Sequence, residues 1–183
     1  FKEASSNRYS SALYAKLFKA LMDKFEFMYA VFDNNYKEVF NIFDNIELSS
    51  ETDNYDKLCE INKINDNRKS LCEFYVNLML HGVIDPEKLL EIINLVQHKV
   101  MSLMKVEGNS NQVEEYSELL YILLPKSYKY VIKNSSDSVI SQYKLLTDDA
   151  TTISECTRGA FTSLSNKSIF RHMDIIEEIE DEL

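Results

Sequence analysis

Histidine is the side chain best suited to acid–base or metal chemistry near neutral pH, and this sequence has three: His81, His98 and His172. They lie far apart, and no H-x-x-x-H or H-x-x-E-H spacing places two of them on one helical face as metal ligands. The spacing therefore favours surface or partly buried histidines with a structural role over a metal site.

Cysteine is the other side chain that could ligate a metal or form a covalent bond. Cys59, Cys72 and Cys156 are widely separated and form no C-x-x-C pair, so they indicate neither a zinc site nor a disulfide framework. We interpret them as buried free thiols of a protein from a reducing compartment.

Carboxylate pairs occur at Asp148-Asp149 and Glu177-Glu178. The first pair is typical of a helix cap and first turn, and the second of a solvated tail, rather than of a catalytic dyad. Gly82, Gly108 and Gly159 are isolated, so the sequence has no glycine-rich phosphate loop. We therefore predict a protein that is not an enzyme and uses no metal or cofactor, so that any ATP would belong to a partner.

Two pairs of basic side chains are candidates for binding rather than for catalysis. Arg68 and Lys69 are expected at a helix start, where the helix dipole disfavours cations. Lys167 and Arg171 are spaced i, i+4 on the last expected helix, beside an acidic tail. One interpretation is surface charge with local ion pairs, and the other is contact with a partner.

Composition limits the class of protein. The chain has 183 residues, of which 45% are hydrophobic and 27% charged, enough for one large domain or two small ones with a core. A net charge of −10 argues against tight, independent nucleic-acid binding and is compatible with docking onto a basic partner.

No apolar run approaches a membrane span and no signal peptide is visible, so we expect a cytoplasmic protein without membrane contact. Because the first residue is Phe1 rather than Met, we expect an excised piece of a longer protein.

Residues 67–105 are expected to form a helical hairpin at the centre of the fold. The apolar residues of 71–79 and of 89–104 repeat with helical spacing. Between them, Gly82 suits a left-handed C-terminal cap, Asp85 a helix N-cap and Pro86 the first helical position. Two amphipathic helices cannot bury their apolar faces alone, so the rest of the chain should supply further hairpins.

The remaining chain also has the period of helices. We expect them at 9–23, with a stripe of Leu13, Leu17, Ala20 and Leu21; at 25–46, with a break at 33–35; at 55–64; at 113–124, stopped by Pro125; at 128–146, as a short turn and a second helix separated by 135–137; at 148–163, capped by 147–149; and after Ser165. In the last helix, the residues expected to point inward are Ile169, Phe170, Met173, Ile176 and Ile179. Residues 47–54 and 108–112 are expected to be loops.

These elements predict an all-α fold without strands. With only 3 glycines and 2 prolines, long helices are favoured over sheets with tight turns. Helical hairpins at a spacing of about 40 residues suggest an α-solenoid of stacked antiparallel hairpins, HEAT- or armadillo-like, over 1–183 as a single domain. A closed helical bundle is the alternative, and 177–183 is expected to be an acidic, frayed tail.

Several stretches, in order, resemble one family. Residues 9–17 (YSSALYAKL) look like an aromatic-Ser-x-x-Tyr-Ala-x-Leu helix, with one extra residue. Residues 68–84 look like a basic-basic-x-Leu signature followed by a Phe-Ile-Gly-x-Leu segment, with shorter spacing. Residues 114–120 occupy the place of a Glu-rich start to a Leu-Leu helix, and 165–175 (SNKSIFRHMDI) resemble a closing Ser-Ser-Arg-Ile-(Lys/Arg)-Phe helix. The family is the middle domain of the gamma scaffold subunit of eukaryotic initiation factor four, here lacking its usual first helical pair.

The resemblance implies a HEAT-repeat scaffold of translation initiation that binds a DEAD-box RNA helicase of the factor four A type. Such a domain contacts both recA-like lobes, orients them and stimulates ATPase and unwinding without doing chemistry itself. It implies the helicase as partner, with mRNA and other initiation factors as further candidates, and no small-molecule substrate. By match to the family's basic positions, it nominates Arg68, Lys69, Lys167 and Arg171 as the residues that contact helicase or RNA.

Alternatives remain at this point. Relatives in mRNA decay, splicing and nuclear cap binding share the fold and bind other helicases, although the closing helix favours the translation branch. From other classes, an RNA-binding helical-repeat module would need a steep salt dependence of RNA affinity, and an all-α enzyme would need a polar pocket with perturbed carboxylates or histidines.

Overall fold

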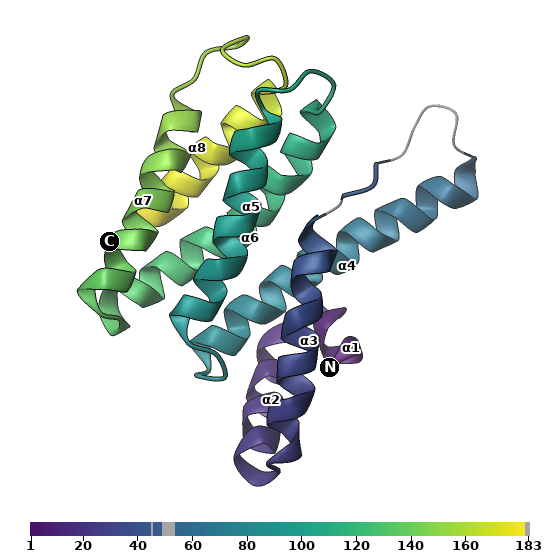
Figure 1. Cartoon of the computed structure of the whole chain (residues 1–183), viewed down its shortest axis with the longest axis vertical. Helices are drawn as coiled ribbons and strands as arrows, with labels where there is room; N and C mark the ends of the chain where they lie inside the picture. The colour runs from purple at the N-terminus through teal and green to yellow at the C-terminus, as the bar shows by residue number, and fades with distance from the viewer. Residues whose placement is uncertain (45, 49–53, 182–183) are drawn as a thin grey trace. The chain divides into compact units, whose positions relative to one another are not determined.

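The computed structural model describes residues 1–44, 46–48 and 54–181, and within these ranges the chain is helical and contains no strand (Figure 1). The prediction of an all-α fold is therefore confirmed. No helix in the described ranges combines the length and the hydropathy needed to cross a lipid bilayer. The chain divides into two compact units, Phe1–Ile84 and Asp85–Leu183. The single domain over 1–183 stays a prediction.

The first unit is built on aromatic packing. Its helices are α1 (Lys2–Ser5), α2 (Ser11–Lys24), α3 (Phe27–Asp44) and α4 (Tyr55–Leu80). Helix α2 contacts α1, α3 and α4, and α1 also contacts α4. In the core, the ring of Phe74 meets those of Phe1 and Phe18 edge to face, with centroids 5.3 Å and 6.5 Å apart, and Tyr75 lies 6.5 Å from Phe32. Edge-to-face pairs add to the burial of the rings and fix how the helices pack.

The C-terminus of α4 ends as its sequence predicts. Gly82 has a positive φ of 67°, which a glycine adopts without the penalty of a Cβ. The Gly82 N–H donates to the Met79 carbonyl (2.9 Å) and the Val83 N–H to the Leu78 carbonyl (2.8 Å), the two bonds of a Schellman cap. Helix α5 then begins with Asp85 as N-cap and Pro86 in the first turn, as expected. Because α4 and α5 belong to different units, their packing as a hairpin stays a prediction.

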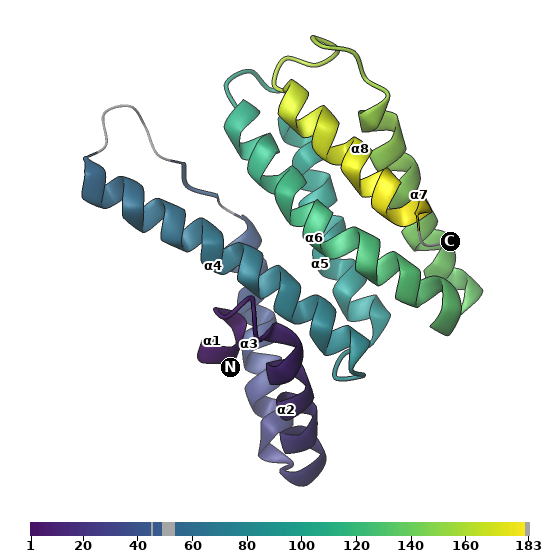
Figure 2. The ribbon, with the colours of Figure 1, turned by 180° about the vertical axis from the view of Figure 1, so that it is seen from behind.

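The second unit is an array of helices with a mainly aliphatic core that also contains the buried Tyr116 and Tyr143. Its helices are α5 (Pro86–Leu103), α6 (Ser110–Asn134), α7 (Asp137–Ser154) and α8 (Asn166–Glu180). Helix α5 contacts α6, α7 contacts α8, and contacts of α5 with α7 and of α6 with α8 join the two pairs (Figures 1 and 2). The α7–α8 connection is tied to the α5–α6 connection, because Ser163 donates to the carbonyls of Met104 (3.0 Å, from N–H) and Val106 (2.6 Å, from Oγ).

Three predicted helix boundaries are wrong, because the helices run straight through the polar residues that suggested them. Helix α3 is unbroken through 33–35, and α4 joins the predicted 55–64 and 67–80 helices into one. Helix α7 continues through 147–149 to Ser154, and no helix covers 155–165.

The polar side chains at these points turn back onto their own helix instead of capping a new one. The amide of Asn35 donates to the Val31 carbonyl (2.7 Å), the hydroxyl of Ser70 to Asp66 (2.9 Å) and that of Thr147 to Tyr143 (2.8 Å). Each contact spans four residues, so the side chain shares a carbonyl already used by the helix and leaves the backbone ladder intact.

The prediction that Pro125 ends a helix is also wrong, because Pro125 lies inside α6 and is buried. Proline removes one backbone donor, which normally ends a helix. Here Ser127 lies in the next turn and its hydroxyl donates to the carbonyls of Leu123 (2.5 Å) and Leu124 (3.0 Å). Packing of α6 on α5, α7 and α8 on both sides of the proline supplies the stabilisation that local propensity lacks.

The predicted inward faces of α2 and α8 are wrong in part. The buried stripe of α2 is Ser11, Ala15, Phe18 and Met22, whereas Leu13, Leu17 and Ala20 of the expected stripe are exposed and Leu21 is half-buried. In α8, Ile169 and Ile179 are buried as expected and Ile176 is half-buried, but Phe170 and Met173 are exposed and His172 takes a core position.

The predicted acidic tail and one predicted loop fall partly outside the described residues. Of the acidic tail 177–183, residues 177–180 belong to α8 and Asp181 is its C-cap, with its N–H 2.9 Å from the Glu177 carbonyl; residues 182–183 lie outside the described residues. Of the predicted loop 47–54, residues 49–53 lie outside them, and 47, 48 and 54 are not helical, as expected.

Candidate partner-binding site

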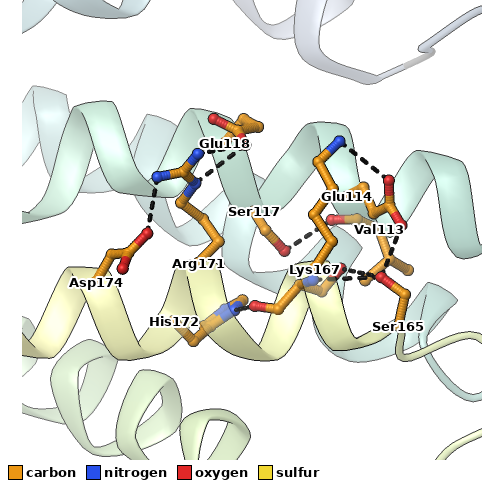
Figure 3. A network of polar contacts seen from close by, with 10 residues as sticks. Val113, Glu114, Ser117, Glu118, Ser165, Lys167, Arg171, His172 and Asp174 are labelled. Carbon is orange, nitrogen blue, oxygen red and sulfur yellow. Dashed lines mark hydrogen bonds and ion pairs between the residues drawn. The ribbon is translucent and has the colours of Figure 1, made fainter.

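Lys167 lies in a polar network between the start of α8 and the start of α6 (Figure 3). Its Nζ is 3.1 Å from Glu114 Oε2. The other carboxylate oxygen of Glu114 accepts from the hydroxyl of Ser165 (2.7 Å), and that hydroxyl in turn accepts the Ser168 N–H (3.2 Å) as the predicted N-cap of α8. One carboxylate on α6 therefore holds both the cap and the first turn of α8.

Arg171 forms the second half of the network, one helical turn further along. Its Nε and Nη2 donate to Glu118 Oε1 (3.0 and 2.8 Å), and its Nη1 donates to Asp174 Oδ2 (2.9 Å). The guanidinium carbon also lies 4.5 Å from the centroid of the Tyr121 ring, a cation–π contact. The pairing of 114 with 167 and of 118 with 171 runs in the same direction along both helices, so α6 and α8 are parallel.

The charge balance of this surface is acidic. Lys167 and Arg171 are accompanied by the carboxylates of Glu114, Glu118 and Asp174, and Glu178 Oε1 accepts from the Tyr121 hydroxyl at 3.5 Å. Burial, together with the nearby Glu178, raises the pKa of Tyr121 above its usual value, so the phenol stays a proton donor. A site that captures phosphate needs excess positive charge, which this arrangement does not have.

Beneath the network lies a buried histidine. Nδ1 of His172 is 2.8 Å from the Ser168 carbonyl oxygen, which can only accept, so Nδ1 carries the proton. The other ring nitrogen, Nε2, is buried and has no hydrogen-bond partner among the described residues. Burial lowers the pKa of His172 and the Ser168 carbonyl opposes this, so the ring is neutral and part of the core.

Arg68 and Lys69 lie in the middle of α4, so the prediction that they begin a helix is wrong. Arg68 is only 5% exposed. Its Nε donates to the Ile42 carbonyl (3.1 Å) and its Nη1 to Asn65 Oδ1 (2.5 Å), which ties the end of α3 to α4. Lys69 is half-buried. The structure thus brings Lys167 and Arg171 together in one unit and places Arg68 and Lys69 in the other.

A cavity of about 360 Å³ opens beside Arg68 in the first unit. Its lining is largely apolar and includes Phe1, Ile42, Ile64 and Leu71.

No cluster of three or more metal-ligating side chains occurs in the described part of the chain. Burial raises the pKa of the Cys72 thiol far above its usual value, so this cysteine is an inert core group.

Two groups of surface residues were not predicted from the sequence. The exposed Leu13 and Leu17 of α2 and the exposed Phe170 and Met173 of α8 were assigned to the core. Helical spacing alone marks an apolar stripe but does not say whether a neighbour covers it; the charges interleaved with these residues were the available signal.

The second group lies beyond Pro125. Because α6 does not stop there, Lys126, Lys129 and Lys133 share one helix at spacings of three and four, alternating with Tyr128 and Tyr130. The prediction of a helix end at Pro125 had separated these lysines from the acidic start of the same helix. Positive charge in the last turns of a helix is favoured by its dipole.

Comparison of the chain with protein-family models, with curated proteins and with solved structures found no match. Within the described residues the protein is all-α and carries ion pairs at its surface. The family resemblance rests on the sequence segments alone.

Proposed function

We propose that this chain is a scaffold of translation initiation, without enzymatic activity, that binds a DEAD-box RNA helicase of the factor four A type. In this proposal the helices form a HEAT-like α-solenoid and the protein acts in the cytoplasm. The observation that carries the proposal is the α6–α8 pair. The two segments that resemble the family's Glu-rich and closing helices pack in parallel and are joined by charges at the matched positions.

The packing of the second unit is compatible with stacked hairpins. Helices α5 and α6 form one adjacent pair and α7 and α8 the next, with contacts between α5 and α7 and between α6 and α8. In an array of hairpins, equivalent helices of successive repeats run parallel, as α6 and α8 do. Such an array gives a firm surface on which a partner's lobes could be held.

A scaffold stimulates a two-lobed helicase if it binds the lobes more tightly in their closed orientation than when they are apart. The required difference is small, because a several-fold rise in turnover corresponds to about 1 kcal/mol. Lys167, whose side chain is 59% exposed, is the better placed of the two α8 cations to reach a partner. Arg171 is held by two carboxylates and a ring, and we assign it a positioning role.

The direct test measures ATP turnover of the DEAD-box helicase from the same organism, with RNA, as this chain is added. We expect several-fold stimulation and a complex detectable by titration. The absence of both binding and stimulation would reject the proposal. A panel of helicases from initiation, mRNA decay and splicing decides between this role and the related helicase-binding domains.

The role of the basic residues needs variants that separate folding from binding. Reversing Arg171 alone leaves three carboxylates together, so Arg171→Glu should be combined with Glu118→Arg to restore the ion pair. If the exchanged pair keeps both stability and helicase affinity, Arg171 acts only within the fold. Lys167→Glu is expected to weaken helicase binding, and unchanged affinity would remove Lys167 from the site.

One observation favours RNA binding as a second candidate function. Lys126, Lys129 and Lys133 on α6, interleaved with tyrosines, combine positive charge with rings on which bases could stack. RNA affinity that falls steeply with salt, and that Lys129→Glu and Lys133→Glu weaken, would support it. The net charge of −10 counts against it.

A further inference from the structure

Two helices, one in each unit, carry large apolar side chains on their outer faces. On α2, Leu13 is 68% and Leu17 51% exposed. On α8, Phe170 is 60% and Met173 45% exposed. In each case the helix buries a different face within its own unit, so these side chains contribute little to the core and remain available for an intermolecular contact.

The charges that share each outer face have opposite signs. Lys16 lies three residues after Leu13, and Lys24 lies seven residues after Leu17 and eleven after Leu13, so both lysines share the side of α2 that carries these leucines. This group of four residues is called the basic stripe. Neither lysine forms an ion pair with a carboxylate among the described residues. Asp23, which lies seven residues after Lys16 on the same side of α2, is paired with Lys19.

The outer face of α8 is acidic. Glu177 and Glu180 continue the line of Phe170 and Met173, at spacings of three, four and seven residues, and all four are exposed. This group is called the acidic stripe. The cations of α8, Lys167 and Arg171, are turned toward α6 and paired with its carboxylates, so they do not neutralise the acidic stripe (Figure 3).

Charge decides which surfaces can meet. Two basic stripes, or two acidic stripes, would bring like charges together around an apolar contact, which opposes association. A basic stripe against an acidic stripe buries four large apolar side chains and pairs lysines with glutamates. The chain thus carries both halves of one complementary contact.

We propose that the occupant of the basic stripe is a second copy of this chain, bound through the acidic stripe on its α8. The contact is heterologous, with different surfaces on the two copies, so association is head to tail and can continue beyond a dimer. Each stripe is small, so the association is weak and dependent on concentration. This inference does not depend on the proposed helicase binding.

The first experiment measures the mass of the chain by sedimentation velocity from micromolar to millimolar concentration, the range in which small interfaces dissociate. We expect the average mass to rise with concentration. A monomer over the whole range would overturn the proposal. This holds both for stripes exposed to solvent and for stripes covered by other parts of the same chain.

Two variants, in which exposed apolar side chains are replaced by uncharged glutamines, then test which surfaces meet. One carries Leu13→Gln and Leu17→Gln, and the other carries Phe170→Gln and Met173→Gln. Each variant alone should stay monomeric, because each lacks one half of the contact. An equimolar mixture should form a dimer that grows no further, because it contains one intact basic stripe and one intact acidic stripe. Association by either variant alone, or none in the mixture, would overturn the head-to-tail contact.

Charge exchange provides the matched control. Lys16→Glu with Lys24→Glu should raise the dissociation constant at least tenfold, and so should Glu177→Lys with Glu180→Lys. Combining the four changes in one chain should restore association, because the stripes are complementary again with their signs exchanged. The positions are exposed, so the helical circular dichroism of each variant should match that of the parent chain. The urea midpoint should shift only slightly, downward with Lys24→Glu and upward with Glu180→Lys, because the helix dipole favours cations in the last turn. Failure of the combined variant to recover would contradict charge pairing between the stripes.

Discussion

Arg68 in the first unit and Arg171 in the second are both arginines from the nominated set, yet their environments differ. Arg68 is buried and donates to a backbone carbonyl and an asparagine oxygen. Arg171 lies at the surface and donates to the carboxylates of Glu118 and Asp174. These two hydrogen bonds of Arg68 go to neutral oxygens and are sheltered from water, whereas the contacts of Arg171 with the two carboxylates are ionic and screened by it. We therefore expect the hydrogen bonds of Arg68 to contribute more to the free energy of unfolding than the ion pairs of Arg171.

The physical reason is desolvation. When a buried partner is removed, the remaining polar groups lose their hydrogen bonds without gaining water. At the surface, water replaces the lost partner, and exposed ion pairs contribute only about 0–1 kcal/mol. The two cores also differ, because rings cluster in the first unit and aliphatic side chains predominate in the second. Variants of the two arginines therefore report on different environments.

The largest effect is expected for Arg68→Met. It leaves Asn65 Oδ1 and the Ile42 carbonyl without this donor and should lower the free energy of unfolding by about 3 kcal/mol. Urea unfolding followed by circular dichroism measures the change. Arg68→Lys keeps the charge but not the planar fork and should recover only part of the loss. A change below about 1 kcal/mol would show that burial does not make this contact the stronger one.

A pH effect follows from His172 in the second unit. Its pKa is lowered from the ordinary 6.5 by burial, so the unfolded chain binds the proton more readily. Stability from this group is therefore full above about pH 6.5 and falls as the pH drops toward the folded pKa, by at most about 1.4 kcal/mol per pH unit. Urea midpoints measured at several pH values should show a shallower dependence for His172→Gln than for the parent chain. Equal slopes would mean that His172 is not held neutral.

Arg171→Met should lower the free energy of unfolding by about 1 kcal/mol, since the ion pair with Glu118 is only partly exposed. A double-mutant cycle with Glu118→Gln isolates the pair from other effects of the substitutions. The coupling should shrink in high salt. A coupling as large as the Arg68 effect would remove the contrast between the two arginines.

Lys167→Met is expected to have the smallest effect, about 0.3 kcal/mol, because Lys167 is the more exposed cation and makes a single contact with Glu114. Ser165→Ala supplies a comparison at the same carboxylate, since it also removes the N-cap of α8 and should cost about 1 kcal/mol. The same urea titration measures both. A larger loss for Lys167→Met than for Ser165→Ala would reverse this ranking.

How far the sequence predicts the site can be judged from its residues. Spacing placed Lys167 and Arg171 on one helix behind the Ser165 cap, and local ion pairs were one of the two interpretations offered. The identity of the partners, Glu114 and Glu118, was not predictable, because they lie about fifty residues away on another helix. The same limit applies to Arg68, whose burial depends on the end of α3.

By itself the sequence determined the helical class and the local signals that depend on a few neighbouring residues: the Schellman cap at Gly82, Pro86 at the start of α5 and the Ser165 cap. Only the tertiary structure decided where helices continue and which faces are covered. Helix α6 passes Pro125 because its packing outweighs one missing hydrogen bond, and Leu13 and Phe170 lie outward because other residues of their helices meet the neighbours. Local signals depend on the backbone of one turn, whereas burial depends on residues that are distant in the sequence.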